Sequence, residues 1–202
     1  KFAAATQAAL GFFEAAGYTV ENGKVTAAPE GAKMTYEIII GADGSGDHPS
    51  FAILTDAKAA LESIGFTLEI NDVTDSNIMW DALNAGTAEM WAAAWQATVD
   101  PDMYQVYHSA SVKSNYYHIN DETLDQDIID ARSTADQEYR KSVYKQCLDI
   151  ILDWAVEIPI YQRQNCVIYS PERINADTFT KDVTTFYSWS VSYTHLRAHE
   201  TR

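Results

Sequence analysis

The chain has 202 residues, of which 47% are hydrophobic and 21% are charged, as is ordinary for a soluble globular protein. Its 29 acidic and 14 basic residues give a formal net charge of -15, so neither nucleic acid nor an anionic membrane surface is expected as a partner. No stretch reaches the roughly 18 consecutive apolar residues that a membrane span needs, and no signal peptide is visible.

Two units in which a strand precedes a helix are predicted in the first half of the chain. After an amphipathic helix that stops at Gly17, the first strand covers residues 34–40, and Pro49 suits the first turn of the helix that follows. The second strand covers residues 66–70, where apolar and polar residues alternate, and a short helix then ends at Gly86. Because the crossovers are short, the strands are expected to be parallel.

The stretch from Met90 to Trp95 is expected to be a third strand, which completes a βαβαβ run. It has no charge and no turn residue, as is typical of a strand covered on both faces of a parallel sheet. Open sheets of this kind bind ligands beyond the carboxyl ends of their strands, so the loop after Trp95 is the leading candidate site. The polar and aromatic residues there that could orient and cover a ligand are Trp95, Gln96, Thr98, Asp100, Asp102 and Tyr104.

Two interpretations of the acidic pair in this loop are open. Asp100 and Asp102 flank a proline, which restricts Asp100 to extended geometry and could direct both carboxylates outward as an anchor for a cation or an amine. The same residues are also typical of a turn that caps a helix. Trp95 is likewise either a wall on which a ligand stacks or a part of the core.

Two helices are predicted in the second half of the chain. Asn120 or Asp121 caps the first of them, and Thr134 and Gln137 have the spacing of a capping box for the second, which is the longest. The residues expected on the inner face of the first helix are Leu124, Ile128 and Ile129. The expected apolar stripe of the second is Val143, Cys147, Ile150, Ile151 and Trp154, and Arg140 is assigned to its solvated face. An extended segment should follow, from residue 158 to residue 169.

No metal or cofactor is predicted. The sequence Asp43-Gly-Ser-Gly-Asp47 is similar to the start of a calcium loop, but His48 replaces the turn glycine and Leu54 replaces the bidentate acid, so a flexible strand-to-helix loop is expected instead. No histidines have metal-ligand spacing, and no residues are spaced for nucleophilic catalysis. Cys147 and Cys166 either form a disulfide or are two buried thiols, and the second alternative is favoured.

Six short motifs occur in an order that resembles the extracellular solute-binding proteins of ABC transporters, in the family that binds oligopeptides, dipeptides and nickel complexes (family 5). These motifs are Ala15-Ala-Gly-Tyr18, Leu61-Glu-Ser-Ile-Gly-Phe66, Trp95 followed by Asp100-Pro-Asp102, Asn115-Tyr116, Arg140-x-x-x-Tyr144 and Glu157-Ile-Pro-Ile-Tyr161. The resemblance covers about residues 3–190. Residues 191–202 differ in character and resemble a vector or adapter sequence read through in frame.

The resemblance implies an α/β fold, namely a periplasmic-binding-protein-like lobe with a βαβαβ mixed sheet flanked by helices. Members of the family are longer and fold as two lobes that close over the ligand, so residues 1–190 are expected to be a carboxy-terminal lobe whose partners include the missing first lobe. The resemblance further implies capture of a peptide or small cationic solute for the permease subunits of an ABC importer. The location that it implies is the periplasm or, through a lipid anchor, the extracellular face of the cytoplasmic membrane.

Two further ligand-contacting residues, Asn115 and Tyr116, are implied by the resemblance, and ordinary packing is the alternative role for them. Peptide-binding members place an aspartate shortly after the tryptophan of this loop, where it pairs with the ligand's α-amino group. In this sequence Thr98 stands near that place, and Asp100 lies two residues later. The chain therefore departs from the family pattern at the position that holds a free amino terminus.

Two other classes of function remain as alternatives. A hydrolase such as a glycosidase could use Asp100 and Asp102 as acid and base, but the carboxyl groups of glycosidases must lie about 5 Å or more apart around the sugar. Residues two positions apart are poorly placed for that, so no enzyme is expected. An interaction domain without a small ligand would instead have a well-filled surface at the place where the cleft is predicted.

Overall fold

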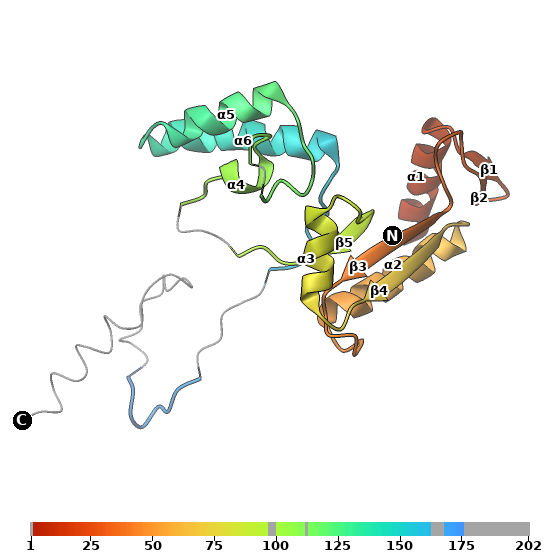
Figure 1. Ribbon diagram of the computed structural model, residues 1–202, viewed down its shortest axis with the longest axis horizontal. Helices are drawn as coiled ribbons and strands as arrows, with labels where there is room; N and C mark the ends of the chain where they lie inside the picture. The colour runs from red at the N-terminus through yellow and green to blue at the C-terminus, as the bar shows by residue number, and fades with distance from the viewer. Residues whose placement is uncertain (1, 97–99, 112, 163–167, 176–202) are drawn as a thin grey trace, which may run out of the picture. The chain divides into compact units, whose positions relative to one another are not determined.

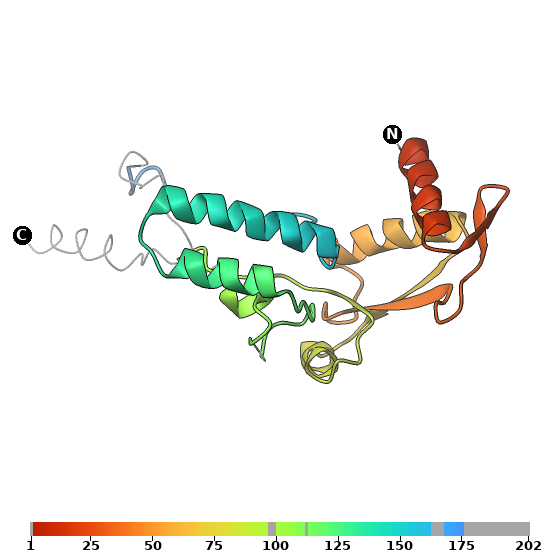
Figure 2. The ribbon, with the colours of Figure 1, turned by 90° about the horizontal axis from the view of Figure 1, so that it is seen from above.

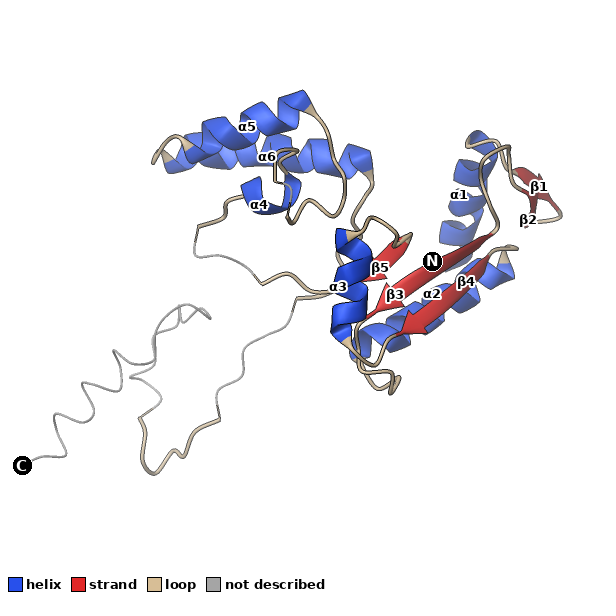
Figure 3. Ribbon diagram, viewed as in Figure 1, coloured by secondary structure: helices blue, strands red, loops and turns tan. Residues whose placement is uncertain are grey.

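The computed structural model describes residues 2–96, 100–111, 113–162 and 168–175. The chain divides into two compact units, Lys1–Trp95 and Gln96–Arg202. Helices and strands make up the first unit, and the regular elements described in the second are all helices (Figure 3). The predicted adapter tail lies outside the described residues, and the extent of the predicted lobe stays a prediction.

A three-stranded parallel sheet organises the first unit (Figure 1). β3 (Thr35–Ile40) lies between β4 (Thr67–Asp72) and β5 (Met90–Ala92), and pairs in parallel with both. α2 (Pro49–Ser63) connects β3 to β4, and α3 (Ser76–Asn84) connects β4 to β5. The βαβαβ prediction is therefore confirmed. The sheet was expected to be mixed, and its described strands are all parallel.

The third strand is shorter and more exposed than its sequence predicts. β5 ends at Ala92 rather than at Trp95, and among the described strands it pairs with β3 alone, at the edge of the sheet. The side chain of Met90 is 38% exposed, so the expectation of a strand covered on both faces is wrong. The physical reason is that the consecutive alanines after Trp91 offer little apolar side chain to bury, and a longer strand gains little.

A hairpin forms between α1 (Phe2–Ala15) and the sheet, where the sequence indicated only a polar segment. β1 (Thr19–Glu21) and β2 (Lys24–Ala27) are antiparallel. The two residues between them, Asn22 and Gly23, have φ angles of 52° and 76°. Positive φ at both central residues is the requirement of the tightest hairpin turn, and Asn-Gly is the dipeptide that meets it most readily. The signal was therefore present in the sequence.

Two apolar clusters fill the first unit. The cluster between β3, β4 and α2 contains Ile38, Ile40, Ala42, Leu54 and Leu68. The second joins α1 and the hairpin to the turn before β4, and contains Leu10, Val25, Ile64 and Phe66. The hairpin is therefore fixed to the rest of the unit by buried Val25.

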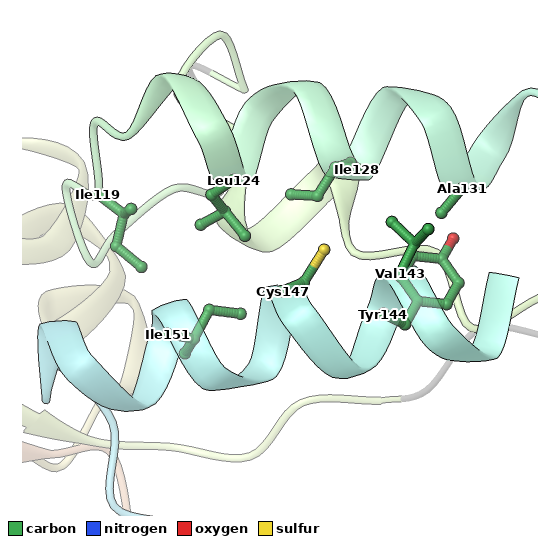
Figure 4. Packing of buried hydrophobic residues seen from close by; sticks show 8 residues of the cluster. All are labelled: Ile119, Leu124, Ile128, Ala131, Val143, Tyr144, Cys147 and Ile151. Atoms are coloured by element: carbon green, nitrogen blue, oxygen red, sulfur yellow. The ribbon is translucent and has the colours of Figure 1, made fainter. Parts of the chain in front are cut away.

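Two helices lie side by side in the second unit, α5 (Glu122–Arg132) and α6 (Gln137–Trp154) (Figure 2). Their facing side chains point into the space between them (Figure 4). The buried residues of this core are Ile119, Leu124, Ile128, Ala131, Val143, Tyr144, Cys147 and Ile151. Among the described residues, no helix combines the length and the apolar character that crossing a lipid bilayer requires.

Side-chain caps begin both helices of this core, and one of the two predicted caps is wrong. Asp121 caps α5 as predicted, and its carboxylate accepts hydrogen bonds from the N–H groups of Thr123 and Leu124. The predicted cap of α6 at Thr134 is wrong. The cap is Asp136, whose carboxylate accepts from the N–H groups at the second and third helical positions, because a carboxylate two residues closer to the helix reaches them directly.

The predicted faces of α5 and α6 need three corrections. Ile129 was expected inside but is 38% exposed, and Trp154 is 41% exposed. The indole N–H of Trp154 donates to the Asp121 carboxylate at 3.3 Å, so this side chain covers the start of α5 rather than filling the core. Arg140, expected on the solvated face, is 9% exposed because it has an acidic partner distant in the sequence.

Cys147 is a free thiol buried between α5 and α6. Cys166 lies outside the described residues. Burial raises the pKa of Cys147 from 9.0 to about 11. The folded state therefore holds the thiol proton over a pH range in which the unfolded chain has lost it.

This raised pKa predicts a pH dependence of stability. Below pH 9 the thiol is protonated in both the folded and the unfolded state, so its contribution to the free energy of unfolding is fully present there. Between pH 9 and 11 the unfolded chain loses the proton first, and this contribution is lost. We expect urea unfolding of Cys147→Ala to show lower stability at pH 7, because of the cavity, but a flatter decline between pH 9 and 11. Parallel curves for the two proteins would contradict the assignment.

Candidate functional site

The carboxyl edge of the sheet brings two loops of the first unit together. β3 and β5 are parallel neighbours, with Ile40 opposite Ala92, so the loop 41–48 and the segment 93–96 leave the sheet at the same edge. Ligands of open parallel sheets bind at this edge, where the chain order changes direction. It is therefore the candidate site of this unit.

Trp95 stands at this edge. Its ring lies edge-on to that of Trp91, with centroids 6.4 Å apart and planes at 81°. It is 39% exposed, whereas Trp91 is half-buried. A ring that rests on a second aromatic residue and still presents part of its surface fits the interpretation of Trp95 as a wall.

Asp72, the last residue of β4, fixes the loop that follows β3. Its carboxylate accepts hydrogen bonds from the N–H groups of Ala42, Gly44 and Gly46, at 3.2, 3.1 and 3.2 Å. A carboxylate that accepts several backbone N–H groups compensates donors that a loop cannot satisfy by itself. The conformation of this edge is therefore set by a side chain from the neighbouring strand.

The acidic segment after the sheet is fastened by two arginines of the second unit. The Asp100 carboxylate is paired with the guanidinium of Arg140 on α6. The Asp102 carboxylate lies 3.0 Å from Nε of Arg132 on α5. The guanidinium of Arg132 also stacks on the Tyr104 ring, at 4.4 Å from its centroid. Two helices thus hold one short segment.

Asp102 also makes the local turn that was the alternative interpretation of this pair. Its carboxylate accepts a hydrogen bond from the N–H of Tyr104 at 3.0 Å, immediately before the short helix α4 (Tyr104–Tyr107). The Asp100 side chain remains 60% exposed beside its arginine. A cationic ligand would have to compete with a guanidinium at either carboxylate, so neither is a vacant anchor.

Asn115 lies in the same unit. Its amide N–H donates to the carbonyl oxygen of Ile119 at 2.9 Å, while its side-chain oxygen is buried and has no hydrogen-bond partner among the described residues. Tyr116, next to it, is half-buried. The donor side of the amide therefore has a structural role, and its oxygen is a buried acceptor whose hydrogen-bonding capacity the described residues do not use.

Two stacked tyrosines and a glutamate make a further contact in this unit. The Tyr107 and Tyr117 rings stack with centroids 5.7 Å apart, and the Tyr107 hydroxyl donates to the Glu157 carboxylate at 2.6 Å. Burial, together with this hydrogen bond, raises the pKa of Tyr107 above its ordinary value. The contact ties the segment after α6 to α4.

The predicted site residues fall on both sides of the unit boundary. Trp95 belongs to the first unit, whereas Gln96, Asp100, Asp102, Tyr104, Asn115 and Tyr116 belong to the second, and Thr98 lies outside the described residues. Gln96 is exposed. The groups placed together by contacts are the acidic segment, Tyr104 and their two arginines. No group of three or more acidic, histidine or cysteine side chains among the described residues is arranged to hold a metal ion.

Sequence reasoning missed three residues that fix the candidate segments, Asp72 in the first unit and Arg132 and Arg140 in the second. Arg132 is the last residue of α5, and Arg140 is a charged residue on the buried face of α6. A charged residue at such a place in a helix is the signal that could have identified both as partners of an acidic group. Asp72 ends a strand that is parallel to the one before a glycine-rich loop, and an acid at that place is suited to the loop's N–H groups. In each case the partner is 26 or more residues distant in the sequence.

The Arg140 pairing can be tested by hydrogen exchange. In Arg140→Gln we expect the amide protons of Asp102 and Tyr104 to exchange about tenfold faster, because the segment loses its link to α6. The matched control is Lys145→Gln on the same helix. Lys145 forms an exposed ion pair with Asp149, with Nζ and Oδ2 3.0 Å apart, and both residues belong to α6, so this pair does not hold the acidic segment. Equal exchange in the two variants would mean that Arg140 does not hold the segment.

The fold of the chain is similar to those of several solved solute-binding proteins. The oligopeptide-binding protein AppA from Bacillus subtilis, in complex with a nonapeptide, superposes with a TM-score of 0.63 and is 19% identical, over 74% of this chain and 30% of AppA. NikZ from Campylobacter jejuni, in complex with Ni(L-His), gives a TM-score of 0.60 at 19% identity, over 75% of this chain and 30% of NikZ.

A third similar structure is the ABC transporter-associated periplasmic binding protein DppA from Helicobacter pylori, in complex with the peptide STSA. It gives a TM-score of 0.51 at 24% identity, over 60% of this chain and 24% of DppA. No protein-family model and no curated protein sequence matches the chain. The chain spans less than a third of the length of these three structures. Its fold is similar to that of the ABC-transporter solute-binding proteins of family 5, as the resemblance predicted.

Proposed function

We propose that the chain is one lobe of the substrate-binding component of an ABC importer. The observation that carries this proposal is the similarity of fold to solute-binding proteins over about three-quarters of the chain. AppA and DppA hold peptides and NikZ holds a nickel complex, so a peptide or another small solute is the proposed cargo. The first lobe and the permease subunits are the proposed partners.

The proposed mechanism is closure of two lobes over the solute. A solute that contacts both lobes stabilises the closed state by the difference between its affinities for the closed and open states. Most of its surface is then buried between the lobes. No bond is made or broken, and the chain is not proposed to be an enzyme.

The proposed ligand contacts begin at the carboxyl edge of the sheet. Trp95 supplies an apolar wall, and Gln96 and Thr98 lie one and three residues after it in the chain. In the second unit the side-chain oxygen of Asn115, which has no hydrogen-bond partner among the described residues, supplies an acceptor, and Tyr116 is the next residue in the chain.

The acidic pair, Asp100 and Asp102, is not proposed to be an anchor for a cation. Asp100 and Asp102 contact the solute from a segment whose shape their arginines fix, and they do not serve as bare negative charges. Tyr104, under the Arg132 guanidinium, completes that segment. A neutral or zwitterionic solute therefore suits this loop better than a simple cation.

Hydrolysis by the same two carboxylates has no support from their geometry. A glycosidase needs two carboxyl groups that face the sugar from either side, and here both carboxylates are paired with guanidinium groups of the same unit. The similar solved structures AppA and DppA are binding proteins by name. The proposed location is the periplasm or the extracellular face of the membrane, and attachment through a lipid anchor is part of the proposal.

Titration calorimetry tests this function on the full-length protein. A library of di- to nonapeptides, polyamines and nickel complexes should contain a solute that releases heat, and Trp95→Ala should weaken its binding about tenfold or more. The control is Phe12→Ala, which removes an aromatic ring that is 77% exposed on α1. Absence of heat with every class of solute, or equal effects of both variants, would contradict the proposal.

A further inference from the structure

The Asp72 carboxylate stands on a backbone position that strand pairing fixes. Ile40 and Asp72 are opposite residues at the ends of the parallel strands β3 and β4. The N–H of Val73, the next residue, donates to the carbonyl oxygen of Ile40 at 2.9 Å. The half-buried side chain of Asp72 therefore reaches the loop 41–48, which leaves β3 at this edge, from a rigid base.

The three N–H groups that donate to this carboxylate alternate along the loop. Oδ1 of Asp72 accepts from Ala42 and Gly44 at 3.2 and 3.1 Å, and Oδ2 accepts from Gly46 at 3.2 Å. The φ angles are 70° at Asp43, 73° at Gly44 and 75° at Gly46. Backbone N–H groups that converge in this way form a concave nest, and such nests bind anions. In this loop the bound anion is a carboxylate of the chain itself.

The intervening N–H groups are used within the loop. The N–H of Ser45 donates to the Asp43 carboxylate at 2.9 Å, and the N–H of Asp47 donates to the Ser45 hydroxyl at 3.2 Å. Five N–H groups between residues 42 and 47 therefore have acceptors that belong to the chain. An anionic group of a solute would bind them only by displacing one of these acceptors.

The charge of the loop opposes that displacement. Asp43 and Asp47 are exposed carboxylates beside the nest. Hydrogen bonds from Ser45 lower the pKa of Asp43, which keeps this carboxylate ionised at neutral pH. Nδ1 of His48, at the end of the loop, accepts the N–H of Ser50 at 3.1 Å, so this nitrogen offers no proton to an anion. A second anion would be repelled, and Asp72 would lose its donors.

We propose that Asp72 is a specificity-determining residue, which occupies an anion-binding nest from within and so excludes carboxylate and phosphate groups of a solute from the loop 41–48. This inference rests on the proposed solute-binding function and deepens it, because it assigns the charge of the solute group at the carboxyl edge of the sheet. A neutral or positively charged part of the solute lies there. Removal of the Asp72 side chain should convert the loop into a site for a small anion.

An acetate titration of Asp72→Ala, followed by NMR in the 202-residue chain, tests the inference. Acetate replaces chloride at constant ionic strength and supplies the missing carboxylate. Without acetate, the amide protons of Ala42, Gly44 and Gly46 should exchange at least about tenfold faster than in the unchanged chain. With acetate, their resonances should shift to saturation, and their exchange should slow to within about threefold of the original rate.

The matched control is Asp47→Ala. It removes the same charge from the same loop but leaves Asp72, the acceptor of the three N–H groups, in place. Acetate should cause no saturable shift of the three amides in this variant or in the unchanged chain. A second variant, Asp72→Asn, keeps the size of the side chain and loses its charge. Exchange of the three amides should be at least about threefold faster in it.

Several results would overturn the inference. A saturable acetate shift in the unchanged chain means that the nest is open to anions, and this result does not depend on the folding of any variant. Exchange that is unaltered in Asp72→Asn, or in a folded Asp72→Ala, means that the carboxylate does not hold the loop. Faster exchange in Asp72→Ala without a response to acetate means that no anion site was filled. The titration uses no solute, so its failure is distinguishable from failure of the proposed function.

Discussion

Replacing Gly65 with alanine is expected to destabilise the chain by about 2–5 kcal/mol, as measured by urea unfolding. Gly65 has a φ of 102°, and a Cβ atom placed there would lie 2.2 Å from the carbonyl oxygen of Val25. The left-handed backbone and the backbone clash both oppose a side chain. The Val25 carbonyl cannot move aside easily, because the N–H of Val25 donates to the carbonyl oxygen of Ile64 at 2.8 Å.

The control for this variant is Gly86→Ala. Gly86 also has a positive φ, of 66°, but a Cβ atom placed there would meet no atom within 4 Å among the described residues. The variant should therefore lose only the cost of the left-handed conformation, about 1–2 kcal/mol. If Gly65→Ala is no more destabilising than Gly86→Ala, the close approach of the β1–β2 hairpin to the turn before β4 is wrong.

Replacing Ile128 with alanine should cost about 2–5 kcal/mol of unfolding free energy. Ile128 is completely buried between α5 and α6, so truncation removes its apolar contacts and leaves a cavity (Figure 4). Ile129, the next residue, is 38% exposed. Its change to alanine should cost less than about 1 kcal/mol. Comparable losses from the two variants would mean that α5 is rotated from the orientation described.

Much of the fold could be predicted because its signals are local. Pro49 lies in the first turn of α2, Asp121 caps α5, and Gly86 follows α3, each at the expected place. These residues act through hydrogen bonds and dihedral angles within one turn of the chain. The cap of α6 was misplaced because Asp136 competes with Thr134 for the same N–H groups.

The site was harder to predict because its contacts join distant parts of the sequence. The sequence showed that Asp100 and Asp102 are acidic and close to a tryptophan, but not that Arg140 and Arg132 pair with them. Burial of Arg140 depends on that partner, so helical periodicity assigned it to solvent. The exposure of β5 depends on its neighbours in the sheet, which a short apolar run does not reveal.

The proposal that this chain is one lobe of a two-lobed receptor is tested most directly by calorimetry with a single solute. A solute found with the full-length receptor is titrated into that receptor and, under the same conditions, into the 202-residue chain. We expect binding to the chain to be at least about 100-fold weaker, because the contacts from the first lobe are missing. Equal affinity for the two proteins would contradict it.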